Sequence, residues 1–134
     1  MTARRTMVRD EVRDERGSVS IVVVAILTAL FVLAMGVADV ARVFLAASRA
    51  QTAADASALA AAHALAIVED GPTPAELAAE YAARNGAALE TCACELGAFE
   101  ATVTVRLQVV DLYLVAGYRS VVATARAQVD PPSA

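Results

Sequence analysis

An uncharged apolar run near the amino terminus constrains this chain more than any other feature. No Asp, Glu, Lys or Arg occurs between Ser18 and Ala38, and Val, Ala, Leu and Ile dominate the segment. At a rise of about 1.5 Å per residue, a helix over these residues is roughly 32 Å long, and the hydrocarbon core of a bilayer is about 30 Å thick. The sequence therefore predicts a transmembrane helix over residues 18–38.

Three fates are open for this segment. A small-residue motif at residues 36–38 would allow a signal peptidase to cut before Asp39. The apolar part of a signal peptide is usually about 7–15 residues long, so the longer run favours a helix that stays in the chain. That helix would be either an uncleaved anchor or the apolar half of a pilin-like helix whose leader is removed.

The arginines predict an orientation. Five arginines lie within residues 1–17, whereas Arg42 and Arg49 are the two that follow the run closely. Positive charge tends to stay on the cytoplasmic side, so residues 1–17 are predicted to be a cytoplasmic leader. This leader is expected to be a solvated tail, and the alternative is a turn of helix supported by Arg/Glu pairs. The rest of the chain is then extracytoplasmic and the bilayer is a partner. No basic patch is interleaved with aromatic residues, so nucleic acid is not an expected partner.

The helical pattern continues beyond the apolar run. Neither glycine nor proline occurs in residues 39–68, which predicts an extracytoplasmic alanine-rich helix there. Small and apolar residues spaced by three and four form one stripe: Val43, Ala47, Ala50, Ala54, Ala58, Ala61 and Leu65. Small side chains allow a neighbouring helix to approach closely, so the stripe is a candidate packing surface for another subunit. The alternative is that it packs on the C-terminal part of the same chain.

Residues 73–129 predict a small external domain. Thr73 to Glu76 has the pattern of a capping box with proline at the first helical position, and Asn85-Gly86 is typical of a helix end. Alternation of apolar and polar residues over 99–109 and 120–129, and less regularly over 87–95, predicts three strands. A sheet with one apolar face needs a covering helix, so the predicted fold class is α+β.

The connection between the last two strands is apolar. Residues 110–119 include Leu112, Tyr113, Leu114 and Tyr118, and this loop would either tuck under the sheet or contact a partner. Asp39 and Arg42, just after the apolar run, have the spacing of a helical ion pair.

Few residues suit catalysis. His63 is the sole histidine and lies in an alanine-rich helix, and no phosphate-binding loop, serine elbow or zinc-binding helix pattern is present. The chain is therefore predicted to have no catalytic, cofactor or metal site. Cys92 and Cys94 are near the upper limit of separation for a disulfide if both lie on one strand. A local bridge, an intermolecular bridge and two free thiols all remain open.

Two patterns resemble TadE/TadG-like pseudopilins, most closely a short branch called helicase/secretion neighborhood TadE-like proteins. They are Gly17-Ser18 before the apolar helix, and Gln-x-Ala-Ala-Asp-Ala-x-Ala-Leu-Ala at residues 51–60. The resemblance covers residues 16–66, and residues 85–129 more loosely through the Asn-Gly, cysteine and paired-strand layout.

The resemblance implies a minor pseudopilin-like structural subunit of a tight-adherence (Flp-type) pilus or a related secretion machine. Its partners would be other pilin-like or secretion-system subunits, and a prepilin peptidase that cuts between Gly17 and Ser18. The chain differs from pilins at Val22, where they carry a glutamate. The alternative function is a membrane-anchored extracytoplasmic binding domain that does not enter a filament.

Overall fold

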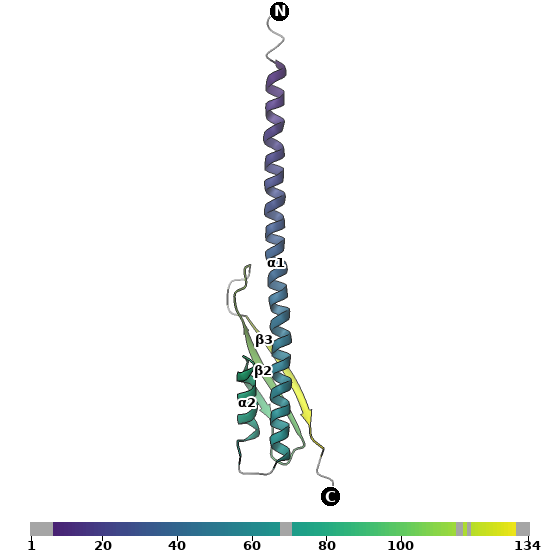
Figure 1. Ribbon diagram of the computed structural model, residues 1–134, viewed down its shortest axis with the longest axis vertical. Helices are drawn as coiled ribbons and strands as arrows, with labels where there is room; N and C mark the ends of the chain where they lie inside the picture. The colour runs from purple at the N-terminus through teal and green to yellow at the C-terminus, as the bar shows by residue number, and fades with distance from the viewer. Residues whose placement is uncertain (1–6, 68–70, 115–116, 118, 131–134) are drawn as a thin grey trace, which may run out of the picture. The chain divides into compact units, whose positions relative to one another are not determined.

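A computed structural model describes the backbone of residues 7–67, 71–114, 117 and 119–130, and side chains from Val19 onward (Figure 1). Two helices precede three strands: α1 (Met7–Ala66), α2 (Pro74–Arg84), β1 (Ala88–Ala93), β2 (Glu100–Val109) and β3 (Arg119–Gln128). The chain divides into two compact units, Met1–Ala38 and Asp39–Ala134. The two helices and the three strands confirm the predicted α+β class.

Helix α1 begins earlier than the sequence predicts. Its first residue is Met7, whereas the apolar run suggests a start at Ser18. Residues 7–16 are therefore helical, which agrees with the alternative that Arg/Glu pairs support helix in the leader. No glycine or proline interrupts this stretch, and adding residues to an existing helix is much easier than nucleating one.

Helix α2 has both of the predicted end structures. The Thr73 hydroxyl accepts a hydrogen bond from the Glu76 backbone N–H, and the Glu76 carboxylate accepts one from the Thr73 N–H at 2.7 Å. At the other end, Gly86 has a φ of 74°, a left-handed conformation that costs glycine little. The N–H groups of Gly86 and Ala87 then donate to the Ala83 and Ala82 carbonyls, which forms a Schellman motif.

The three strands form an antiparallel sheet in the order β1-β2-β3. Val103 pairs with Cys92 on one side and with Ala125 on the other. A register shift between Leu89 and Thr91 forms a bulge in β1, so that Leu89 and Cys92 both contact the core. Alternating residues of β2 and β3 face the core as predicted: Ala101, Val103, Val105, Leu107 and Val109 in β2, and Val121, Ala123, Ala125 and Ala127 in β3.

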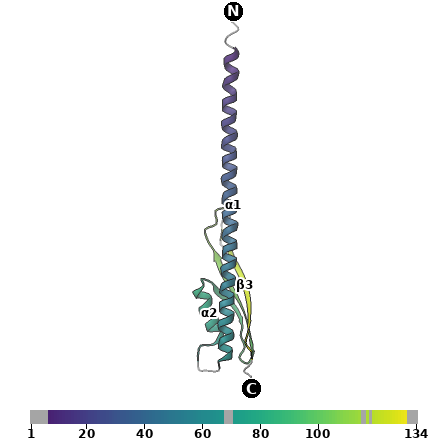
Figure 2. The same ribbon diagram turned by 45° about the vertical axis from the view of Figure 1, so that its right-hand side comes forward.

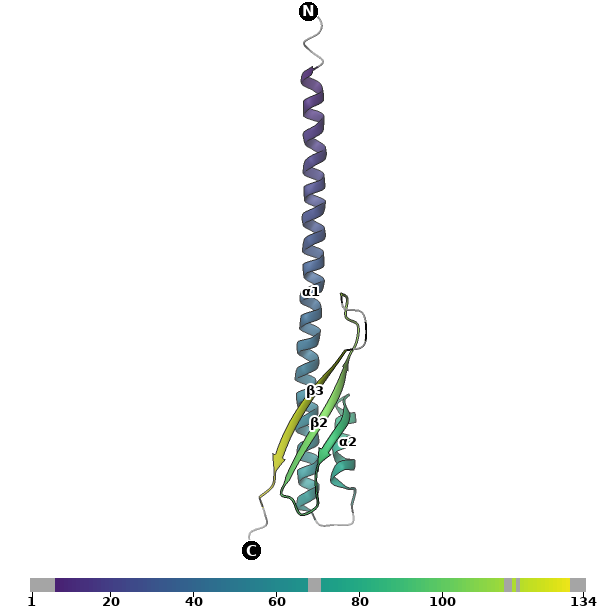
Figure 3. The same ribbon diagram turned by 180° about the vertical axis from the view of Figure 1, so that it is seen from behind.

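One face of the sheet is covered by helices. Figures 1 and 2 show α2 beside the part of α1 that spans residues 39–66. Both helices lie in front of the sheet in Figure 1, and the sheet lies in front of both helices in Figure 3, which is seen from behind. The core contains alanines from the helices and valines from β2, with Val103 and Val105 fully buried. Alanine buries little area, so the larger valines provide more of the hydrophobic stabilisation per residue.

Candidate functional site

The described part of the first unit, residues 19–38, presents apolar side chains on every side. Its Val, Ile, Leu and Phe residues are all exposed, including Ile21, Leu27, Leu30 and Phe31, whereas Met35 is half-buried. Among the described residues, one helix is long and apolar enough to cross a membrane, and it contains this segment. An exposed apolar surface of this extent suits lipid or the apolar helices of other subunits.

The predicted processing site lies at the edge of what the structure describes. Gly17 and Ser18 are in the backbone of α1, but they fall outside the residues whose side chains are described. Val22, where pilins carry a glutamate, is exposed on the helix. Cleavage between Gly17 and Ser18 stays a prediction.

The predicted packing stripe is divided between two environments. Ala50, Ala54, Ala58 and Ala61 are buried and belong to the core that α2 and the sheet complete. Val43 is exposed and Ala47 half-buried, and both line a shallow apolar groove with Phe44 and Leu112. Leu65 packs against the edge of the core. Most of the stripe thus contacts the chain's own domain, which was one of the two alternatives.

Asp39, the first residue of the second unit, is hydrogen-bonded to the loop that follows β2. Asp39 is 7% exposed, and its carboxylate accepts hydrogen bonds from the backbone N–H groups of Tyr113, at 2.7 Å, and Leu114, at 2.8 Å. Charge-assisted bonds of this kind are about twice as strong as neutral ones. Asp111 has a φ of 61°, a left-handed conformation that Asp adopts more readily than most residues.

Arg42 holds the same loop through its side chain. Its Nη2 donates to the Tyr113 hydroxyl at 2.8 Å, and the guanidinium carbon lies 4.2 Å from the centre of the Tyr113 ring. This distance is well within the range of a cation–π interaction. We refer to Asp39, Arg42, Tyr113 and Leu114 as the loop clamp.

Sequence reasoning missed the loop clamp. It considered Asp39 and Arg42 as partners of each other, and it gave the apolar loop a place under the sheet or on a partner. The loop reaches the start of the 39–66 segment and not the underside of the sheet, and Tyr113 and Leu114 remain exposed. A contact of this loop with a partner stays a prediction. Two charges just after a long apolar run were the available signal, because charges in such a place need partners.

Cys92 and Cys94 are joined by a disulfide, with their Cα atoms 5.4 Å apart. Both are half-buried and pack against the core; Cys92 is in β1, and Cys94 follows the end of that strand. Of the three states that the sequence left open, the structure has the local bridge.

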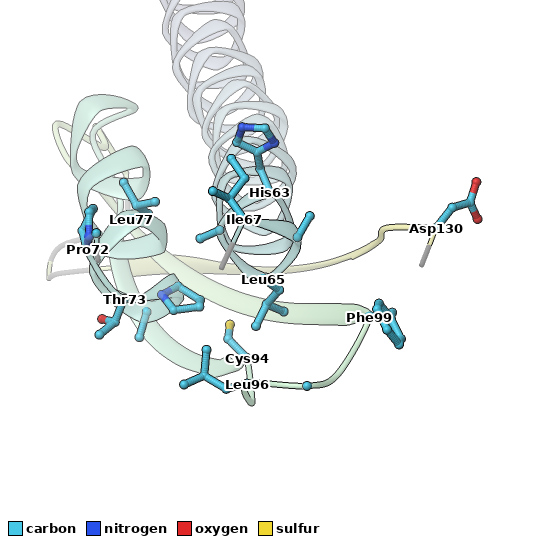
Figure 4. Close-up of a pocket in the computed structure, with 16 residues that line it drawn as sticks. His63, Leu65, Ile67, Pro72, Thr73, Leu77, Cys94, Leu96, Phe99 and Asp130 are labelled. Carbon is cyan, nitrogen blue, oxygen red and sulfur yellow. The ribbon is translucent and has the colours of Figure 1, made fainter. Parts of the chain in front are cut away.

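An open apolar pocket lies at the end of α1 around Ala66 (Figure 4). Its lining includes Leu65 and Ile67 from the α1 end, Leu77 from α2, and Leu96 and Phe99 from the β1–β2 connection. Cys94 also lines the pocket (Figure 4). His63 and Asp130 also line the pocket, and both are exposed.

The outer face of the sheet is polar. Arg106 pairs with Glu90 and Arg126 with Glu100, and the hydroxyls of Thr104 and Thr124 are 3.0 Å apart. The hydrogen bond from the Gln128 amide, and then that from Arg126, lower the pKa of Glu100 below its ordinary value of 4.5. No group of three His, Cys, Asp or Glu residues that could hold a metal ion occurs among the described residues.

Comparison with known families gives one match. Residues 17–64 match the Tad family, described as Flp pilus-assembly TadE/G-like. The match includes the whole apolar segment and most of the alanine-rich helix, and it ends before α2. No curated protein and no solved structure matches the chain.

Proposed function

We propose that this chain, which belongs to the TadE/G-like family, is a minor pseudopilin-like structural subunit of a tight-adherence pilus or a related secretion machine. It would be anchored by residues 18–38, with a cytoplasmic leader over residues 1–17 and an extracytoplasmic remainder over 39–68 and 73–129. It would act by helix packing and not by catalysis. Its partners would be other pilin-like or secretion subunits and a prepilin peptidase.

One observation carries the proposal. The match to a pilus-assembly family over residues 17–64 includes residues 19–38, whose Val, Ile, Leu and Phe side chains are all exposed in the structure. A helix of this kind is stable in a bilayer, and the same surface can exchange lipid for the apolar helices of other subunits without exposing itself to water.

The site of helix packing follows from burial. Ala50, Ala54, Ala58 and Ala61 already contact the chain's own core, so they have no free surface to offer a second helix. The exposed side chains between Val19 and Ala38 do have such a surface. We therefore assign the subunit contacts of the proposed assembly chiefly to residues 19–38.

Exchange of this segment tests the proposal. Residues 19–38 are replaced with a polyleucine helix of the same length, and the leader and the Gly17-Ser18 junction are kept. We expect the protein to remain in the membrane, because polyleucine also spans it, but to lose co-isolation with pilus or secretion subunits. A reporter that is active only outside the membrane, fused after Ala134, should stay active and so report insertion and orientation.

The pocket of Figure 4 favours the second candidate, an anchored binding domain. The matched control is therefore Leu96→Ser together with Phe99→Ser, two exposed apolar residues that line the pocket. If the chain is a binding domain, the two serine substitutions should abolish its co-isolation with pilus or secretion subunits, and the polyleucine helix should leave this co-isolation intact. That pattern would contradict the subunit proposal, which predicts the reverse.

A further inference from the structure

The exposed apolar surface of α1 does not end with the predicted membrane segment. Beyond Ala38, Val40, Phe44 and Leu45 are exposed, and Phe44 reaches 77%. The exposed side chains then become polar or charged: Ser48, Arg49, Gln51, Thr52 and Asp55. The next large apolar side chain exposed on this helix is Leu59. The change from apolar to polar surface therefore falls between Leu45 and Ser48.

Two charged residues, Asp39 and Arg42, lie inside this apolar stretch, and both belong to the loop clamp. The Asp39 carboxylate is buried and accepts two backbone N–H groups of the loop. The Arg42 guanidinium stacks on Tyr113 and donates to its hydroxyl. Charges that have such partners lose much less on leaving bulk water than free charges do.

The loop adds apolar side chains to the same end of the domain. Val110, Tyr113 and Leu114 are exposed although each is apolar or aromatic. Val40 and Phe44 line a groove together with Leu112, which belongs to the same loop. We define the interfacial surface as Val40, Phe44, Leu45, Val110, Tyr113 and Leu114.

We propose that the interfacial surface lies in the headgroup region of the bilayer, so that the external domain is seated on the membrane. Residues 19–45 of α1 have a length of about 40 Å, which exceeds the hydrocarbon core of about 30 Å but fits a bilayer with its headgroups, about 40–45 Å. Tyrosine and arginine beside aliphatic residues are typical of this region. The loop clamp keeps Tyr113 and Leu114 at the membrane surface.

Lipid is the occupant that the sequence order favours. Ala38 is followed at once by Asp39, so the interfacial surface begins where the predicted membrane segment ends. The inference rests on the membrane anchor of the proposed function.

Single tryptophans test the inference, because the chain contains no tryptophan of its own. Phe44→Trp and Tyr113→Trp are made in the full chain, which is reconstituted into phosphatidylcholine vesicles that contain lipids brominated at a shallow or a deep acyl position. Leu114→Trp repeats the loop measurement at a neighbouring exposed position. Leu59→Trp is the matched control, since Leu59 is 67% exposed on the same helix but lies among polar residues.

We expect shallow bromines to quench F44W, Y113W and L114W, and aqueous iodide to quench L59W. Iodide quenching of F44W and Y113W equal to that of L59W would overturn the inference. Protection from both quenchers that depends on the protein-to-lipid ratio would also overturn it, because a second copy would then cover the surface. Leu30→Trp, quenched by deep bromines, reports the anchor separately: its failure would contradict the proposed function, whereas failure at Phe44 and Tyr113 alone would contradict this inference.

Discussion

Ser57 is a polar residue inside a core made mostly of alanine. Its side chain is fully buried, and its hydroxyl has no hydrogen-bond partner among the described residues. The neighbouring positions Ala53, Ala54 and Ala58 are buried as well. A buried hydroxyl without a partner costs about 1–3 kcal/mol, so Ser57 lowers the stability of the domain that it helps to build.

Ser57→Ala should therefore stabilise the domain. We expect a gain of about 1–2 kcal/mol in the free energy of unfolding, since the change removes an unpaired hydroxyl and raises helix propensity. Ser48→Ala, at an exposed position of the same helix, is the control and should gain only about 0.5 kcal/mol from propensity. Urea unfolding of the external domain, followed by circular dichroism in detergent, measures both. A loss of stability in Ser57→Ala would mean that the hydroxyl has a partner in the assembled protein.

Residue roles could be predicted from the sequence where they depend on near neighbours. The capping of α2 by Thr73 and Glu76 involves residues three positions apart, and the alternation of Val103 and Val105 with threonine is a local pattern. The contact of Arg42 with Tyr113 joins residues 71 positions apart. No periodicity of the sequence encodes such a contact, so the loop clamp became visible only in the folded domain.

At the scale of elements, the start of α2 gives this domain a pH dependence. Hydrogen bonds from the Thr73 backbone N–H, and then from its hydroxyl, lower the pKa of Glu76 below its ordinary value of 4.5. The folded state thus favours the ionised carboxylate more than the unfolded state does. The stabilisation is present above the unfolded pKa and is lost as the pH falls through the folded one.

Glu76→Gln should remove this part of the pH dependence. The wild type is expected to be more stable than the variant at about pH 7, and the difference should shrink as the pH approaches about 3, because the wild-type carboxylate becomes protonated. Thermal unfolding of both proteins across this range is the measurement. A difference that stays constant with pH would show that Glu76 acts through its shape and not through its charge.

The bounds of the elements were predictable to different degrees. α2 and the three strands lie within a few residues of their predicted ranges, because capping residues and period-two alternation mark them. The start of α1 at Met7 was not predicted. Charged residues are compatible with either a helix or a tail, and the choice depends on the neighbouring helix from which they can propagate. The bulge in β1 at Glu90 likewise depends on pairing with β2 and has no signal in β1 alone.

For the whole molecule, burial distinguishes two stretches of one helix. Residues 19–38 expose their Val, Ile, Leu and Phe side chains, whereas Ala50, Ala54, Ala58 and Ala61 are buried in a core that α2 and the sheet complete. The sequence could predict a stripe of small residues but not which element packs against it. Small residues suit close packing against a neighbouring helix and against the chain's own sheet alike. The family match spans both stretches without separating them.

The amino terminus of the mature protein decides among the three fates of the apolar segment. We expect it to be Ser18, because a prepilin peptidase would remove the arginine-rich leader and leave residues 19–38 intact for packing. Cleavage after Ala38 would instead make Asp39 the first residue, place a new ammonium group beside the loop clamp, and expose Val40 and Phe44 in a domain without its anchor. Mass spectrometry of the protein from the cell envelope distinguishes the three amino termini.

Gly17→Leu provides the matched variant, because it changes the residue before the predicted cut and leaves the apolar segment untouched. The variant should keep its leader and remain in the membrane, and the five arginines at its amino terminus should hold it there. It should then fail to co-isolate with pilus subunits, since a charged leader cannot leave the cytoplasmic face with the helix. A wild-type chain that starts at Asp39 would contradict pilin-like processing, and an uncut wild-type chain unaffected by Gly17→Leu would leave a permanent anchor as the function of the helix.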